Sequence, residues 1–214
     1  MTPTEIETAA RNKYNAIGDS FFSQEEVLDL MLQACNELAR DCFMIQATYT
    51  TSTVASQQEY SYPTNTIAIK RITYDGKKLK QITFREDDSI TGLNQSTTAT
   101  GTPQYYFVWN ETISLRPIPS SVATLKIYSF NEHSAITTSS TLEIPSQFHM
   151  DIVDFIVSEM AAKDSNFTAA KYYSDRWEKK KLDAKRWVRK QFRGDSFSVV
   201  QDEDQMIEGY LGIV

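Results

Sequence analysis

The residues able to perform catalysis or bind metal are few in this sequence and lie far apart. His133 and His149 are the only histidines, and neither stands in a metal-binding spacing such as His-Glu-x-x-His. Cys35 and Cys42 share one helical pattern and lie about 10 Å apart along it, which is too far for a disulfide bond between them. We expect both cysteines to be buried thiols in a reducing compartment.

Longer catalytic motifs do not occur either. The glycines are scattered, so there is no glycine-rich phosphate-binding loop, and no Gly-x-Ser-x-Gly motif is found. Asp87-Asp88 and Asp202-Glu203-Asp204 can hold a cation, but loose acidic runs are more often solvated surface. The sequence therefore predicts no enzyme, no cofactor and no metal site.

A basic segment with interspersed aromatic residues covers residues 171–193 at helical spacing. It carries ten Lys and Arg against three Asp and Glu, a balance of +7. Three interpretations are open: the helix grips phosphates while its tryptophans stack on bases, its cations form a solvated face, or they pair with acidic surface on a neighbouring subunit. We favour the third, because the same chain supplies acidic segments that a neighbour can offer. The residues predicted for this interface are Trp177, Trp187, Lys179, Lys180, Arg186 and Arg189.

An acidic tail, residues 194–214, follows directly and contains no Lys or Arg. It carries five carboxylates, a balance of −5, and ends in an apolar run. We expect a segment of this composition to be disordered alone and to fold onto a neighbouring protein. The tail residues predicted to bind that neighbour are Tyr210, Leu211, Ile213 and Val214.

The charge of the whole chain limits the classes of partner. The net charge is −6, so the protein without its basic segment carries −13. Such an acidic protein is not expected to bind nucleic acid by long-range attraction. The N-terminus has no signal-peptide pattern and no apolar run approaches ~18 residues, so we expect a soluble, intracellular protein without membrane contact.

Helical periodicity marks both ends of the chain. Helices are predicted over 4–17 and over 23–43, where Ser23 is placed to cap the second helix. A third helix begins at Ile144-Pro145-Ser146 and is apolar on both sides, and the last helix opens at Asn166 or Thr168.

The segment between these helices is typical of short strands. They are predicted at 60–62, 67–74, 79–84, 105–109, 112–115 and 125–130. Asp75-Gly76 predicts a type I′ hairpin turn. A long polar loop, 86–103, separates two hairpins, and loops of this length are usually functional or mobile. The loop residues predicted to face a tail component are Asp87, Asp88, Asn94, Gln95 and Thr97.

The predicted fold class is α+β. Residues 1–47 and 143–193 are expected to form the two halves of a four-helix bundle, because each amphipathic helix needs a partner face. Residues 48–142 are expected to form an inserted small antiparallel β-sandwich or barrel, and residues 194–214 an extended acidic tail.

Six stretches in order resemble one known family. They are FFSQEEVL (21–28) with ACNELAR (34–40), YSYP (60–63), IKRITYDGKKL (69–79), GTPQYY (101–106), ISLRPIP (113–119) and IPSQF (144–148). These stretches are similar to motifs of the head-to-tail connector adaptors of tailed bacteriophages, including the podovirus tail tubular protein A group. The resemblance covers about residues 23–160, and the acidic tail matches no motif of the family.

The resemblance implies a structural protein of the virion neck, assembled in the host cytoplasm. It implies a ring of twelve copies that joins the portal protein to the tail nozzle or tail tube protein and extends the DNA channel. The helices would form the wall of the ring, and the β region would project outward or toward the tail. Packaged DNA would be contacted non-specifically, and the family has no catalytic residues.

Three other functions stay open at this point. A tail-completion or stopper protein would share the virion role but sit lower in the neck. A carbohydrate-binding β domain on a helical stalk would use Tyr105, Tyr106 and Trp109, although their alternation suits a core. A DNA-binding module would bind as a monomer, with steep salt dependence.

Overall fold

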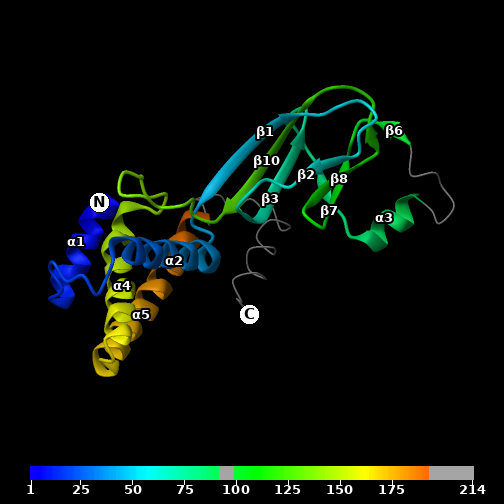
Figure 1. Cartoon of the computed structure of the whole chain (residues 1–214). Helices are drawn as coiled ribbons and strands as arrows, with labels where there is room; N and C mark the ends of the chain where they lie inside the picture. Colours follow the sequence, from blue (N-terminus) through cyan, green and yellow to red (C-terminus); the bar gives the residue numbers. More distant parts are fainter. Residues whose placement is uncertain (92–98, 193–214) are drawn as a thin grey trace. The chain divides into compact units, whose positions relative to one another are not determined.

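A computed structural model describes residues 1–91 and 99–192 of the chain, which forms two units. The helical unit consists of Met1–Ile45 together with the described residues from Asn131 on, and the strand unit is Gln46–Phe130 (Figure 1). Each unit has its own core and is described separately below.

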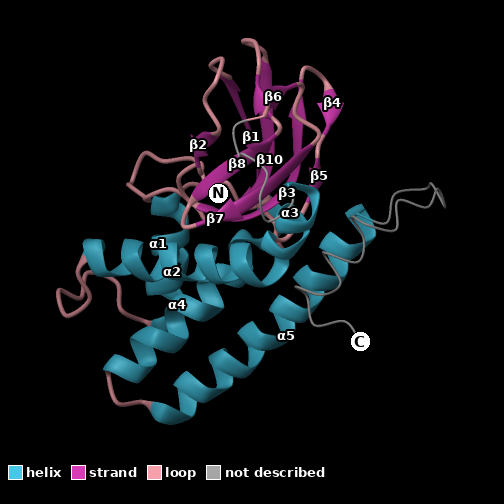
Figure 2. Cartoon of the chain, turned by 90° about the vertical axis from the view of Figure 1, so that its right-hand side faces the viewer, coloured by secondary structure: helices cyan, strands magenta, loops and turns pink. Residues whose placement is uncertain are grey.

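The helical unit is built around one central helix. Its elements are α1 (Pro3–Tyr14), α2 (Gln24–Cys42), the short 3₁₀ helix η1 (Ser146–Phe148), α4 (His149–Lys163) and α5 (Phe167–Phe192). Helix α4 packs against α1, α2 and α5 and lies between α1 and α5 (Figure 1), and Figure 2 shows the short loop that joins α4 to α5. Because α4 has neighbours on several sides, it is apolar nearly all round, with Ile152, Ile156 and Met160 completely buried.

Helix boundaries follow the capping residues. Ser23 accepts a hydrogen bond from the Glu26 N–H (3.2 Å) at the start of α2, which confirms the predicted cap. Helix α1 ends earlier than predicted, because Asn15 adopts a left-handed conformation (φ 61°) and its N–H bonds back to the carbonyl groups of Arg11 and Asn12.

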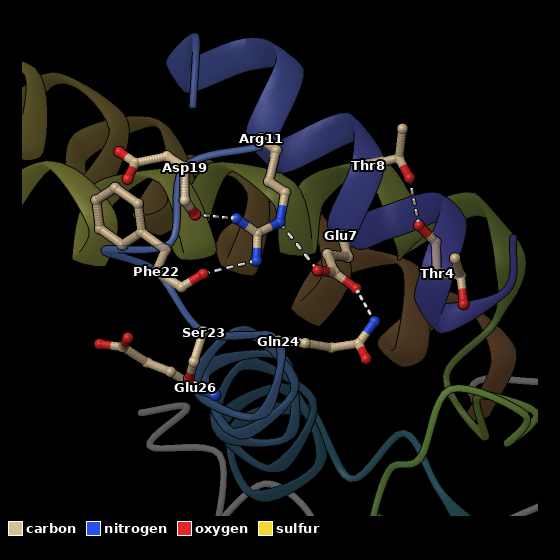
Figure 3. A network of polar contacts seen from close by, with 9 residues as sticks. All are labelled: Thr4, Glu7, Thr8, Arg11, Asp19, Phe22, Ser23, Gln24 and Glu26. Atoms are coloured by element: carbon tan, nitrogen blue, oxygen red, sulfur yellow. Dashed lines mark hydrogen bonds and ion pairs between the residues drawn. The ribbon is translucent and has the colours of Figure 1, made fainter. Parts of the chain in front are cut away.

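A polar network fixes the start of α2 against α1 (Figure 3). The Arg11 guanidinium donates to Glu7 Oε1 (2.9 Å) and to the Phe22 carbonyl (2.8 Å). Gln24 Nε2, in the first turn of α2, donates to Glu7 Oε2 (2.9 Å). The Glu7 carboxylate thus holds one group from each helix, and this sets which side of α2 faces outward.

The strand unit contains ten strands and one helix among its described residues. They are β1 (Gln46–Ser52), β2 (Glu59–Ser61), β3 (Thr66–Tyr74), β4 (Lys77–Lys78), β5 (Lys80–Gln81), α3 (Phe84–Thr91), β6 (Thr100–Gly101), β7 (Tyr105–Trp109), β8 (Thr112–Arg116), β9 (Ile118–Pro119) and β10 (Thr124–Asn131).

These strands form three sheets. Two have four strands, in the orders β1-β10-β3-β4 and β2-β8-β7-β5, and the third is the pair β6-β9. Side chains of both four-stranded sheets share one core that includes Ile72, Leu125, Ile113 and Leu115. Two left-handed residues, Asp75 and Gly76 (φ 50° and 76°), form the turn between β3 and β4, as a type I′ hairpin requires.

The predicted four-helix bundle with a single inserted antiparallel β-sandwich is wrong, and only the α+β class holds. The described residues contain five α-helices, because α3 lies within the strand-rich segment, and the strands form several sheets. Two strand pairs, β5 with β7 and β6 with β9, are parallel. The long loop predicted at 86–103 begins as helix α3 because Thr83 and Glu86 form a capping box: each side chain accepts the other's backbone N–H, at 3.3 and 2.7 Å.

Candidate functional site

Both histidines serve packing in the helical unit. His133 is buried, and its Nε2 accepts the Glu143 N–H at 2.9 Å while its Nδ1 lies 2.6 Å from the Ser134 carbonyl. His149 is also buried, and its Nε2 lies 2.8 Å from the Ile144 carbonyl. Burial lowers the pKa of His149. Rings held in this way connect backbone segments and are poorly placed to receive a ligand.

The two cysteines are fully buried on one side of α2. Burial raises the pKa of Cys35 and of Cys42 to about 12. Both are therefore uncharged thiols at neutral pH, a form that is neither a nucleophile nor a metal ligand. Within 1–91 and 99–192, no group of His, Cys, Asp and Glu is arranged to hold a metal ion.

Helix α5 directs most of its cations to carboxylates of its own chain. Six of its Lys and Arg residues form such ion pairs: Arg176 with Asp154, Lys180 with Asp151, Lys181 with Glu37, Lys185 with Asp41, Lys171 with Asp175, and Arg186 with Asp183. The predicted excess of positive charge is thus largely balanced by acids on α2, on α4 and on α5 itself. The cations that α5 can offer to an outside partner therefore lie on a smaller part of the helix than the sequence suggests.

Lys181 is the most buried of these cations. Its Nζ contacts Glu37 and lies 2.7 Å from Glu178 Oε1 and 3.9 Å from Asp41 Oδ2. Burial acts to lower the pKa of this ammonium group, but the bonds and charges of Glu178 and Glu37 together outweigh it, and the net pKa is raised. Lys181 therefore joins α5 to α2 as a charged group.

The two predicted aromatic anchors of α5 face inward to different degrees. Trp177 is only 2% exposed; its ring packs on Phe155 and its Nε1 donates to Glu37 Oε2 at 3.1 Å. Trp187 is half-buried and meets Phe148 edge-on. Trp177 therefore belongs to the core of its own unit and offers no surface to a neighbour. Helical spacing alone could not separate a core tryptophan from an interface tryptophan.

The outward side of α5, from its middle to its end, carries the remaining cations together with Arg186. We define the α5 patch as Lys179, Leu182, Arg186, Arg189 and Lys190. Leu182 is 53% exposed although it is apolar. No ion pair of Lys179, Arg189 or Lys190 is found within the described ranges, and the buried Nε of Arg189 has no hydrogen-bond partner there. Lys180, predicted for the interface, lies off this patch on Asp151 at 3.2 Å.

The predicted tail-facing residue Asp87 is buried within the strand unit. Its carboxylate receives Arg116 Nε at 2.9 Å and Arg116 Nη2 at 3.1 Å, so the pair is bidentate. This contact joins α3 to β8. It places the Phe84 ring against the rings of Phe107 and Trp109, with centroid distances of 4.9 and 5.1 Å. Trp109, whose alternation suited a core position, is 66% exposed.

Several predicted residues lie outside the described ranges. They are Asn94, Gln95 and Thr97 in the loop, and Tyr210, Leu211, Ile213 and Val214 in the tail. Asp88 lies in α3. None of the described helices combines the length and the apolar character that a membrane crossing requires.

Comparison with known proteins gives one match. Residues 1–197 match the family described as SU10 adaptor protein. No curated protein matches the chain.

Proposed function

Because the chain belongs to the SU10 adaptor protein family, a family of phage head–tail adaptors, we propose that its copies form a closed ring that joins the portal to the tail. Family membership implies a structural protein of the virion that contacts other virion proteins, such as portal and tail proteins. The observation that carries the proposal is the extent of the match, which covers both units of the chain.

The finer features of the proposal are the place and number of the copies. The ring would have twelve copies, lie in the neck between capsid and tail, and extend the channel through which DNA passes. Within the adaptors, the chain would belong with the podovirus tail tubular protein A group. The order of motifs between residues 21 and 148 supports this, since each matches in sequence order.

The proposed role is structural and includes no catalytic step. The thiols of Cys35 and Cys42 are kept protonated by burial, and both histidine rings are engaged by the chain's own backbone. The polar contacts around Glu7, Asp87 and Lys181 connect elements to one another. Contacts of this kind suit a subunit that transmits load between two larger assemblies.

The tail supplies a proposed contact with the portal. This rests on sequence alone: residues 195–214 are acidic and end in Tyr210, Leu211, Ile213 and Val214. Deleting residues 200–214 is expected to weaken retention of the chain by immobilised portal protein. If the shortened chain is retained as well as the full chain, the tail does not contribute to portal binding. The proposed ring would be unaffected by that result.

Mass measurement of the full chain, alone and mixed with the portal protein, tests the ring. We expect monomers or small oligomers alone, and a defined portal complex carrying many copies after mixing. A chain that binds DNA tightly as a monomer, with steep salt dependence, and leaves the portal mass unchanged would contradict the proposal. A chain that joins only after the neck is otherwise complete would identify a stopper instead.

A further inference from the structure

The α5 patch is a solvent-facing stripe whose side chains recur like those of a helix–helix seam. Its exposed members Lys179, Leu182, Arg186 and Lys190 are spaced by three, four and four residues, so they share one side of the helix. Trp177 and Lys181, which face α2, lie on the opposite side. The patch combines an exposed leucine with four cations, a composition that fits an acidic helix with apolar residues of its own.

Helix α2 offers such a face within the same protein. Glu25, Asp29 and Gln33 are exposed at four-residue spacing, and Leu28 and Leu32 beside them are half-buried. Glu25 and Asp29 form no ion pair within the described ranges, whereas Glu26 is paired with Lys163 at 2.6 Å. Gln24, in the first turn of α2, is directed at Glu7 of α1 (Figure 3). Glu25 and Asp29 lie on another side of the helix from Gln24, because successive residues are about 100° apart around it.

One chain cannot bring these two faces together. Its own α2 and α5 already meet through Glu37, Asp41, Lys181 and Lys185, which leaves Asp29 and Arg186 on other sides of their helices. When two complementary faces lie on different sides of one subunit, one face can bind the other face of the next copy. Such a heterologous interface closes into a ring when the copies are related by the right rotation.

We propose that the α5 patch of one copy binds the outward face of α2 on a second copy, an inference that rests on the proposed ring. The helices run antiparallel, with Lys190 beside Glu25, Arg186 beside Asp29 and Leu182 beside Leu32. These positions advance by about one helical turn on each helix, roughly 6 Å, so the three pairs stay in step. The charged pairs set the register, and the two leucines exclude water between them.

Nucleic acid is the less suitable occupant of the α5 patch. Leu182 is 53% exposed, and its apolar surface has no role against a phosphate backbone. A protein helix that carries both carboxylates and leucines satisfies the whole patch.

Short-span bismaleimide cross-linking of two single-cysteine variants tests the contact. Asp29→Cys chains and Arg186→Cys chains are mixed in equal amounts, assembled on the portal protein and treated with the reagent. Native Cys35 and Cys42 are buried and uncharged, so they do not react. Random mixing places the correct pair at about a quarter of the interfaces, so about half of the chains should become cross-linked dimers.

The controls separate this contact from general crowding in the ring. Each single variant alone should give no dimer, because the interface is heterologous. A mixture of Asp29→Cys with Lys171→Cys should also give none, since Lys171 is exposed on α5 but lies about 22 Å along the helix from Arg186. The double variant Asp29→Cys/Arg186→Cys should give a ladder of bands that extends to the full ring.

Charge reversal gives a second, independent readout. Asp29→Lys and Arg186→Glu should each lower the yield of portal-bound rings, and the double variant should recover it. Rings that form normally without cross-links, or a dimer from Asp29→Cys alone, would overturn the α2–α5 contact and leave the adaptor role standing. Loss of DNA retention by Arg186→Glu with rings intact would assign the patch to nucleic acid, and absence of rings from the unmodified chain would overturn both proposals.

Discussion

Replacing Arg116 with methionine tests whether the buried ion pair determines the position of α3. The Asp87 and Arg116 side chains are 8% and 10% exposed, and the guanidinium reaches both carboxylate oxygens at 2.9 to 3.2 Å. Methionine keeps much of the volume of the arginine stem but donates no hydrogen bond. In the variant, the buried Asp87 carboxylate therefore loses the cation closest to it.

The expected loss of stability is large. Removing one partner of a buried ion pair costs about 3–5 kcal/mol, because the remaining carboxylate loses its bidentate cation. Replacing both partners, as in Arg116→Met/Asp87→Leu, removes that charge and should restore most of the stability. The double-mutant cycle should therefore give a coupling of at least about 3 kcal/mol between the two positions, since a double variant that regains most of the stability offsets at least one whole single-variant loss.

Urea unfolding of the full chain measures these differences. Trp109 reports on the strand unit, because its ring meets Phe84 of α3 edge-on, with the ring centroids 5.1 Å apart. We expect a lower midpoint for Arg116→Met at an unchanged slope, and an early loss of the Trp109 signal if α3 detaches first. If Arg116→Met lowers the free energy of unfolding by less than about 1 kcal/mol, the ion pair does not hold α3 in place. The same conclusion follows if the loss in the double variant equals the sum of the losses in the two single variants.

Three further predictions concern the helical unit. Trp177→Ala should lower the free energy of unfolding by about 3–5 kcal/mol, measured by urea denaturation, because it empties a core position that is only 2% exposed; an effect below about 1 kcal/mol would contradict a core role. The pKa of Lys181 is raised on folding, so its contribution is complete below its unfolded value of about 10.4 and is lost as pH rises through the higher folded value. Unfolding of the wild-type chain against Lys181→Met should therefore show a stability difference that shrinks only above about pH 10.4, and a difference already lost at pH 8 would reject this. Cys35 and Cys42 should stay unmodified by a disulfide reagent until urea unfolds the chain, and rapid labelling of the folded protein would contradict their burial.

Local sequence signals predicted the regular elements where capping and alternation agree. Ser23 marked the start of α2, Asp75-Gly76 marked a hairpin, and the alternating residues of β7 and β8 gave their ranges closely. Helix α3 was missed even though its signal, Thr83 followed three residues later by Glu86, is present in the sequence. The polar composition of 86–103 outweighed that signal. The parallel pairing of β5 with β7 and of β6 with β9 depends on contacts distant in sequence.

The candidate site was predicted less well, because the charges along one helix do not show which residues of other helices pack against it. Arg176, Lys180 and Lys181 meet carboxylates that come from α2 and α4. Only the fold brings these distant residues together, so a net charge counted along α5 overstated the surface available to a partner. The three- and four-residue spacing of Lys179, Leu182 and Arg186 puts them on one side of the helix, but spacing alone does not show that Leu182 is exposed.

Electron cryo-microscopy of the chain assembled on its portal protein tests the adaptor role most directly. We expect a closed ring of copies of this chain against the portal, coaxial with the channel, with each copy touching two neighbours through different faces. Isolated copies scattered on the portal, or a portal with no added density in the presence of excess chain, would contradict the account.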